Sequence, residues 1–385
     1  MIARAFRYAK GVAPLRNACT LLLALALLLA SAGSAHAGEK LKVLVPDKES
    51  LQYLAFWVAK GGGSFEREGV DLELLVAPPP QRGKAPMDGF LESGEADAAV
   101  LTPPTYLRLI ATKAPIVVVA NLFRNDPYAL VARASRKVPE NGTVKERLAA
   151  VQGTTLSYPP AGYGRLKALL VSQGLDVDKD FKPTVLLSRD LGVPFKDKSV
   201  ETTYLLSPFL EKAVASGEAV VVVNQAKGEV PELANRQTNV LVVTRKVATE
   251  RRETVVAAVR AIADAEKRIH ASQPEAVDAL IKELAGRDRA ELETAVRLYE
   301  PGVPETPEVR AQDLAPALAL IPESVPKPEL AGVDLASFVA SDMYGASAAS
   351  DPGKSYRKIA IGFAVAAAVI ALARTVLRRR RAAAS

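Results

Sequence analysis

The sequence predicts an α/β protein of two lobes, each built on a mostly parallel β-sheet flanked by helices. The first third of the chain alternates short apolar runs, at residues 41–45, 71–76, 98–101 and 116–120, with amphipathic segments at 51–59, 86–93 and 104–112. A second series of this kind lies within residues 144–223. Strands that alternate with helices indicate βαβ units. About 300 residues lie between an N-terminal segment (1–37) and a C-terminal segment (344–385) that are treated separately below. That length suits two hydrophobic cores better than one.

The lobe boundaries follow from these two series. We expect residues 38–133 to form the first part of lobe I, 134–239 to form lobe II, and 240–343 to return to lobe I. The returning part begins with a strand at 240–244 and continues with helices at 254–270, 274–285 and 290–299, whose apolar residues recur at helical spacing. Pro274 is a helix start signal. Proline-rich segments at 301–307 and 322–328 are expected on the surface.

Residues 1–37 have the three parts of a secretory signal peptide. A basic segment precedes the apolar run 21–30, and the small residues Ala35 and Ala37 mark a cleavage site before Gly38. An uncleaved N-terminal anchor is the alternative. In both cases the pattern predicts that the chain from Gly38 onward is exported.

The C-terminal segment is expected to anchor the protein in a membrane. Residues 359–373 are all apolar or glycine, and snorkelling of Arg374 lengthens the span to 359–377. A tether at 344–358 precedes the helix, and a basic tail at 378–385 follows it. The tail predicts a cytoplasmic C-terminus, with the globular part on the periplasmic side of the inner membrane. A removable sorting tail is the alternative, although no cleavage motif is evident.

The composition argues against several classes of function. Cys19, the only cysteine, lies in the predicted leader with His36, so His270 is the single histidine of the mature chain. Disulfides, cysteine nucleophiles and multi-histidine metal sites are therefore excluded, and we predict no catalytic residue, metal or cofactor. Removing the four positive charges of the leader and the eight after Gly353 from the net +7 leaves −5. No nucleic-acid partner follows from that charge.

Two stretches carry a resemblance to a known family. Residues 51–74 read LQYLAFWVAKGGGSFEREGVDLEL, and residues 91–122 read LESGEADAAVLTPPTYLRLIATKAPIVVVANL. They resemble the nitrate/sulfonate/taurine class of ABC-transporter substrate-binding proteins, which has the type 2 periplasmic-binding-protein fold. Residues 262–286 resemble the helix pair that closes that fold. The likeness is weak in lobe II, where 157–170 reads SYPPAGYGRLKALL and the turn at 216–220 lacks an expected aspartate.

The resemblance implies a ligand site between the lobes. Ligands of such folds lie at the carboxyl ends of strands and the amino ends of helices, where N–H groups and the helix dipole favour polar or anionic groups. By position, the candidate ligand-binding residues are Gln52, Tyr53, Thr102, Thr105, Asn121, Ser157, Gly162, Tyr163 and Asn224. An ordinary cap or turn is the alternative for each. We expect Thr102 to leave free N–H donors at the start of its helix.

Other conspicuous side chains have simpler interpretations. Arg82 and Arg124 follow strands, where they are placed to meet a carboxylate or sulfonate or to be solvated. Phe56 and Trp57 are expected in the core. His270 is expected to complement the dipole at a helix end.

The resemblance implies an extracytoplasmic solute-binding protein, and the C-terminal segment predicts that it is anchored in the membrane. It captures a small polar or anionic solute for an ABC permease and its ATPase, without catalysis. The alternative is a periplasmic sensor or assembly factor that uses the same lobes to bind a ligand or a protein at the membrane. A third class, enzymes similar to thiamine-pyrimidine synthases, is disfavoured because the mature chain lacks cysteine.

Overall fold

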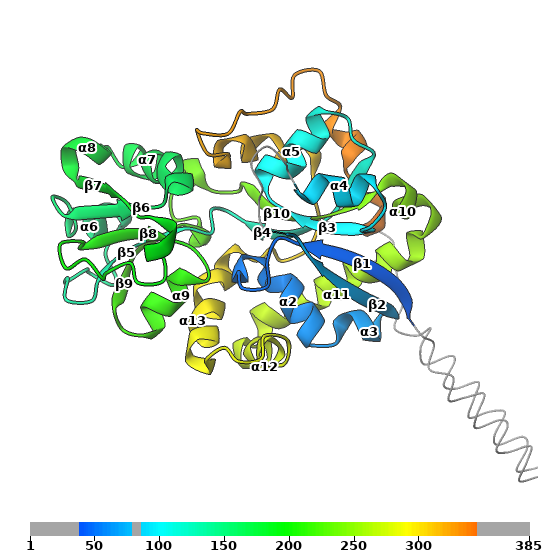
Figure 1. Cartoon of the computed structure of the whole chain (residues 1–385), viewed down its shortest axis with the longest axis horizontal. Coiled ribbons are helices and arrows are strands. Elements are labelled where there is room, and N and C mark those ends of the chain that lie inside the picture. The colour runs from blue at the N-terminus through cyan, green and yellow to red at the C-terminus, as the bar shows by residue number, and fades with distance from the viewer. Residues whose placement is uncertain (1–37, 79–85, 345–385) are drawn as a thin grey trace, which may run out of the picture.

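The computed structural model describes residues 38–78 and 86–344, and it shows two lobes side by side (Figure 1). The predicted leader, tether, membrane helix at 359–377 and basic tail lie outside these residues. None of the helices in the described ranges combines the length and apolarity needed to cross a bilayer.

Lobe I is built on a five-stranded sheet of order β2-β1-β3-β10-β4. Its strands are β1 (Glu39–Val45), β2 (Val70–Val76), β3 (Ala98–Leu101), β4 (Ile116–Arg124) and β10 (Gln237–Thr244). β1 is parallel to β2 and β3, whereas β10 is antiparallel to both β3 and β4. Four strands thus run in one direction, as predicted, but the sheet is mixed because β10 is reversed.

Lobe II repeats this arrangement in the order β7-β6-β8-β5-β9. Its strands are β5 (Ala129–Arg133), β6 (Thr155–Tyr158), β7 (Lys182–Val185), β8 (Thr202–Leu205) and β9 (Ala219–Asn224). β6 is parallel to β7 and β8, and β5 is antiparallel to β8 and β9. In each lobe the reversed strand is the one that immediately follows a crossing between the lobes.

The predicted lobe boundaries were wrong by several residues. β5, which we assigned to lobe I, pairs with β8 and β9 in the sheet of lobe II. On return, Gln237 already pairs with Arg124 of lobe I. The lobes therefore exchange at 125–128 and at about residue 236. β5 and β4 are both apolar and almost fully buried, so the composition does not change where the chain changes lobe.

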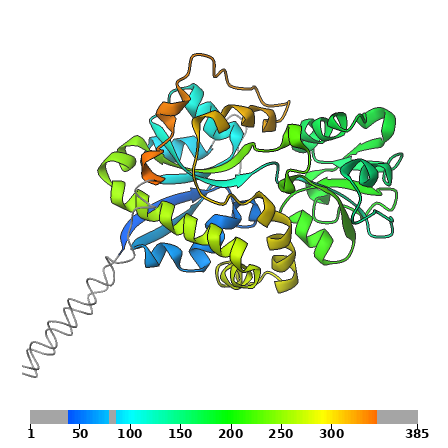
Figure 2. The same ribbon diagram turned by 180° about the vertical axis from the view of Figure 1, so that it is seen from behind.

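Helices cover both faces of each sheet (Figures 1 and 2). In lobe I they are α2 (Leu54–Gly61), α3 (Ser64–Arg67), α4 (Pro86–Glu92), α5 (Pro103–Ala111), α10 (Arg245–Glu250), α11 (Arg252–Ala271), α12 (Gln273–Glu283) and α13 (Arg289–Tyr299). In lobe II they are α6 (Val144–Ala149), α7 (Tyr163–Ser172), α8 (Val177–Asp180) and α9 (Phe209–Ala215). Pro274 lies in the first turn of α12, as its helix-start signal predicted.

The core beneath the sheet of lobe I continues into lobe II. Phe56 and Trp57 are fully buried in it, which confirms their predicted place. The same apolar cluster contains Tyr299 of α13 and reaches Leu205 and Leu210 of lobe II. α13 packs against α9, so it joins the two lobes from below (Figure 1).

After α13 the chain crosses to the opposite face of lobe I. We call residues 300–325 the strap. Its Pro307 carbonyl accepts a hydrogen bond from the Asn121 backbone N–H of β4 at 2.8 Å. Its 3-10 helix η8 (Ala315–Leu320) packs against α5. The strap therefore lies along the junction of the two lobes, on the side opposite α13.

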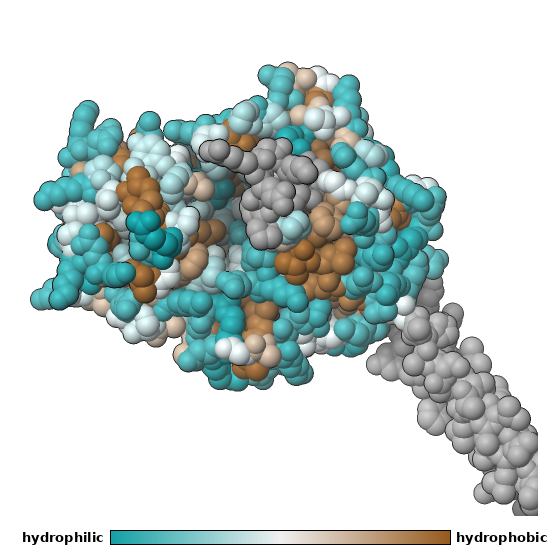
Figure 3. All heavy atoms as spheres, in the orientation of Figure 1, coloured by the Kyte–Doolittle hydropathy of each residue, from teal (hydrophilic) through white to brown (hydrophobic). Residues whose placement is uncertain are grey.

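The surface is mostly polar, with apolar patches on both lobes (Figure 3). In lobe II, Val185, Leu187 and Val193 are each between 43% and 49% exposed. They belong to β7 and to the irregular segment after it.

Candidate functional site

The lobes meet through a buried chain of hydrogen bonds. The Leu51 backbone N–H, at the start of the 3-10 helix η1 (Leu51–Tyr53), donates to Ser207 Oγ of lobe II at 2.6 Å. The Ser207 hydroxyl in turn donates to Glu211 Oε1 at 2.6 Å. Arg287 donates to the same carboxylate oxygen at 3.0 Å and to the Glu49 carbonyl at 2.7 Å. We call Leu51, Ser207, Glu211 and Arg287 the interlobe relay.

The interlobe relay holds a carboxyl group in an unusual environment. Glu211 is fully buried on α9, and burial raises the pKa of its carboxyl above its ordinary value, against the opposing hydrogen bond from Ser207 and the charge of Arg287. Removing one partner of such a buried pair leaves the other uncompensated. Contact between the lobes at the relay therefore depends on the continued pairing of Ser207, Glu211 and Arg287.

The Leu51 N–H is a backbone donor that reaches lobe II from the segment after β1. It follows β1 at the carboxyl end of the strand and points across the lobe boundary, because its partner belongs to lobe II. Backbone donors at such positions suit anionic or polar oxygen atoms. In the structure the serine hydroxyl of Ser207 occupies this position.

We expected free backbone N–H donors at the start of α5, after Thr102, and this expectation was wrong. Thr102 is the N-cap, as predicted, but Pro103 and Pro104 occupy the first two helical positions and have no N–H. The N–H of Thr105 donates to the Thr102 carbonyl at 3.0 Å. The start of α5 therefore offers no free backbone donor through these residues. The Thr102 side chain, which makes no capping hydrogen bond, is what remains for a ligand.

The wall of lobe II is aromatic and tightly packed. Tyr128 and Tyr204 stack with ring centroids 4.7 Å apart. Gly162 lies against them, since a Cβ atom there would be 3.0 Å from Tyr204 and 3.2 Å from Tyr128. Burial raises the pKa of Tyr128 to about 12. Even an alanine at position 162 would therefore require the stacked rings to shift slightly.

A buried ion pair fixes this wall to the strap. Arg165 Nη1 lies 3.2 Å from Asp126 Oδ1, with the two side chains 12% and 5% exposed. Arg165 also donates through Nε to the Leu320 carbonyl of the strap at 2.9 Å. The strap thus contacts lobe II as well as lobe I.

The predicted site residues divide into three groups. Ser157 and Asn224 are used internally, because Ser157 Oγ donates to Thr203 Oγ1 and Asn224 Nδ2 donates to the Leu298 carbonyl. Gly162 and Tyr53 are buried in packing. The half-buried residues are Gln52, Thr102, Thr105 and Tyr163, and Asn121 is buried with Oδ1 unpartnered. The structure brings Gln52 and Tyr53 together through a 3.2 Å hydrogen bond.

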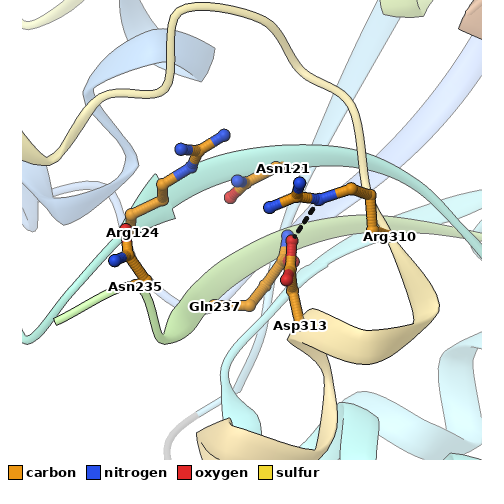
Figure 4. A pocket seen from close by; sticks show the side chains of 6 residues that line it. All are labelled: Asn121, Arg124, Asn235, Gln237, Arg310 and Asp313. Atoms are coloured by element: carbon orange, nitrogen blue, oxygen red, sulfur yellow. Dashed lines mark hydrogen bonds and ion pairs between the residues drawn. The ribbon is translucent and has the colours of Figure 1, made fainter. Parts of the chain in front are cut away.

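Three cavities lie near these residues, one large and two of about 10 Å³ each, of which one is lined by Asn224. The large cavity, of about 390 Å³, belongs to lobe II and is lined by Ser157, Thr184, Asp190 and Lys196 among others. Its volume is in the range of small-molecule pockets. The other small cavity is lined by Asn121 and Arg124, among others (Figure 4). It lies at β4 and β10, which we call the hinge strands because each is next to a crossing between the lobes. Within the described residues, no group of three or more histidine, cysteine, aspartate or glutamate side chains is arranged to hold a metal ion.

Sequence reasoning missed the residues that join the lobes. Ser207, Glu211 and Arg287 are separated from Leu51 by more than 150 positions, and no local pattern marks them. Arg165 lies in the stretch where the family likeness is weak. The Ser207-Pro208 dipeptide before α9 indicates a turn, but it does not indicate a contact between the lobes.

Three further expectations concern charged residues. Arg82 lies outside the described residues. Arg124 lines the hinge cavity. His270 lies in the last turn of α11, as predicted, with its Nδ1 2.8 Å from Glu300 Oε1.

Comparison with solved structures shows the same fold. The aliphatic sulphonate binding protein SsuA from Escherichia coli matches at 18% identity and TM-score 0.54, covering 80% of this chain and 99% of that one. The nitrate-binding protein NrtA from Synechocystis PCC 6803 matches at 15% identity and TM-score 0.52, covering 82% and 90%. The desulfurization enzyme DSZB also matches, at 15% identity and TM-score 0.52, covering 80% and 98%.

The fold alone does not decide between binding and catalysis, since it occurs in both kinds of protein. No curated protein matches the sequence. The family model described as "NMT1/THI5 like" matches residues 50–276, more than half of the chain and parts of both lobes. The chain therefore belongs to the NMT1/THI5-like family and has the two-lobed fold of the nitrate- and sulfonate-binding periplasmic proteins.

Proposed function

We propose that the protein captures a small polar or anionic solute at the junction of its lobes and delivers it to an ABC-type importer. The observation that carries this proposal is the Leu51 N–H, which points across the lobe boundary at the carboxyl end of β1. A solute oxygen atom would compete with Ser207 for that donor. The half-buried side chains of Gln52, Thr102 and Tyr163 would supply further polar contacts.

The proposal includes the predicted setting. The globular part works outside the cytoplasm, held to the inner membrane by the helix at 359–377, next to its permease and ATPase. The relatives named for sulphonate and nitrate binding support the class of solute. We propose that Gln52, Thr102 and Tyr163 bind the solute without catalysing a reaction.

Native mass spectrometry of the full chain, purified in detergent, tests the proposal. We expect a bound species of small-molecule mass that dissociates on collisional activation and is reduced in a Thr102→Leu variant. A mass increase that instead corresponds to a co-purified membrane protein, with no small molecule bound, would favour an assembly factor.

A further inference from the structure

The strap is fixed firmly to lobe I. Pro307, near its start, accepts hydrogen bonds from the Asn121 backbone N–H of β4 and from the Tyr344 hydroxyl. Four apolar side chains farther along are at most 3% exposed and pack in the cluster around α5, namely Leu314, Ala317, Leu320 and Ile321. Separating the strap from lobe I would expose this apolar surface to water. The strap should therefore move together with lobe I.

The strap meets lobe II at the start of α7. Arg165 donates to the Leu320 carbonyl through Nε at 2.9 Å and through Nη2 at 2.5 Å. Glu323 lies beside the same turn of α7, since a Cβ atom at Gly164 would be 3.2 Å from Glu323 Cγ. Glu323 is exposed, whereas Leu320 is buried. We call Gly164, Arg165, Leu320 and Glu323 the interlobe latch.

The guanidinium group of Arg165 suits this position. The Leu320 carbonyl lies at the end of the 3-10 helix η8, where carbonyl groups have no partner within their own helix. Two charge-assisted hydrogen bonds from one guanidinium group satisfy it. The same group is paired with Asp126 in the first crossing between the lobes and lies over the ring of Tyr128. Arg165 therefore links the strap, the crossing and lobe II.

The interlobe latch joins the two helices whose first turns carry candidate ligand residues. η8 packs against α5, whose N-cap is Thr102, and Arg165 comes two residues after Tyr163 in α7. Figure 1 shows the strap between these two helices. Because the strap is fixed to lobe I, movement of α7 away from α5 would separate Arg165 from the Leu320 carbonyl.

We propose that the interlobe latch is a conformational lock, which holds the lobes at the separation found in this structure and opens when they move apart. On opening, the strap stays on lobe I. Arg165 keeps its ion pair with Asp126 and exchanges the Leu320 carbonyl for water. The proposal concerns the movement of the lobes and not the solute, so its test needs no ligand and can fail independently of the proposed function.

Double electron–electron resonance on the full chain in detergent tests the latch. Cys19 is the only cysteine of the chain, so a Cys19→Ala protein can be labelled at two chosen sites. Spin labels at Lys267→Cys, exposed on α11 of lobe I, and at Lys145→Cys, exposed on α6 of lobe II, report the separation of the lobes. With the latch intact we expect one narrow distance distribution.

Arg165→Gln should add a component at longer distance. The ratio of open to closed molecules should rise at least about tenfold, because two charge-assisted hydrogen bonds are lost. Arg189→Gln is the matched control, since Arg189 also belongs to lobe II but its side chain is 78% exposed. It should keep the wild-type distribution.

Gly164→Glu opens the latch without removing the buried pair of Arg165 and Asp126, so it remains informative if Arg165→Gln does not fold. The new carboxylate would lie beside Glu323, and the two like charges repel each other. We expect the same longer component. Adding Glu323→Lys should restore the narrow distribution, because the repulsion becomes an attraction, whereas local crowding alone would not be relieved. A folded Arg165→Gln or Gly164→Glu protein with the wild-type distribution, or failure of Glu323→Lys to rescue Gly164→Glu, would overturn the proposal.

Discussion

At the scale of single residues, Ser207 is the contact on which the interlobe relay depends. It accepts from the Leu51 N–H and donates to Glu211, both of which are buried. We expect Ser207→Ala to lower the free energy of unfolding by about 1–3 kcal/mol, because it leaves a buried donor without a partner and removes a hydrogen bond from a buried carboxyl. Urea unfolding of the two proteins measures the difference.

The matched control for that prediction is Ser199→Ala. Ser199 is exposed and donates to Asp197 within its own turn. Its replacement should change the free energy of unfolding by no more than about 0.5 kcal/mol. If Ser207→Ala costs no more than Ser199→Ala, the relay does not hold the lobes together.

Glu266 predicts a dependence of stability on pH. Its carboxyl is fully buried without a hydrogen-bond partner in the described structure, and Arg124, Glu305 and Tyr344 are the groups that interact with it electrostatically. Burial raises its pKa in the folded state, so the folded protein retains a proton that the unfolded chain loses above the ordinary value of 4.5. The stability of the wild type relative to Glu266→Gln should therefore fall as pH rises from that value toward the folded pKa.

The slope of this difference is at most about 1.4 kcal/mol per pH unit, the limit for one proton. Urea unfolding at several pH values between about 5 and 8 measures it. Glu275→Gln, at an exposed position on α12, is the control and should show a nearly constant difference. A constant difference for Glu266→Gln as well would contradict the assignment.

At the scale of elements, local patterns predicted the framework but missed the crossings. The strands at 98–101 and 240–244 and the helix at 254–270 were found because their apolar residues follow strand or helix spacing. β5 was placed in the wrong lobe, since strand pairing is decided by distant partners that a local pattern does not contain. β8 is four residues long and wholly buried, with Thr202 and Thr203 in place of aliphatic residues, so it was not recognised as a strand.

The candidate site was less predictable than the fold. Thr102 follows β3 as predicted, but Asn121 and Ser157 lie inside β4 and β6, and the available donors depend on details of the backbone. Pro103 and Pro104 remove the N–H groups that a helix start would otherwise offer, and this could be read from the sequence. The pairing of Leu51 with Ser207 could not be read from the sequence, because it joins two lobes whose relative placement depends on the whole fold.

The close packing of the first residues of the strap against β4 should make the stability of the protein sensitive to substitution there. Gly302 lies against Phe123 of β4, and a Cβ atom at position 302 would overlap the Phe123 ring. We expect Gly302→Ala to lower the free energy of unfolding by about 1–3 kcal/mol through overpacking. Thermal or urea unfolding measures the change.

Gly192→Ala is the matched control for the strap. Position 192 is exposed, and a Cβ atom there would meet nothing within 4 Å. That substitution should be neutral or slightly stabilising, by up to about 1 kcal/mol, because it reduces the entropy of the unfolded chain. Equal effects at 192 and 302 would show that the strap is not packed against β4 as described.

At the scale of the whole molecule, two connections besides the hinge strands and the interlobe relay hold the lobes. α13 and the apolar cluster around Tyr299 join them on one side, and the strap joins them on the other through Arg165 and Leu320. In the function that we propose, the lobes would open for a solute by breaking polar contacts while the shared core stays packed. We propose that the solute replaces Ser207 in the interlobe relay, since one oxygen acceptor would replace another at the Leu51 N–H.

The central claim is that a small polar or anionic solute binds between the lobes near Leu51 and Thr102. The most direct measurement is the thermal unfolding of the full chain with nitrate, taurine, alkanesulfonates and small carboxylates, at constant ionic strength. A true ligand should stabilise the wild type by about 2.7 kcal/mol at a hundredfold excess over Kd. Thr102→Leu should remove that stabilisation, whereas Thr112→Val, at the other end of α5, should keep it. A ligand that stabilises Thr102→Leu as strongly as the wild type, or a panel in which no compound stabilises the wild type, would contradict the account.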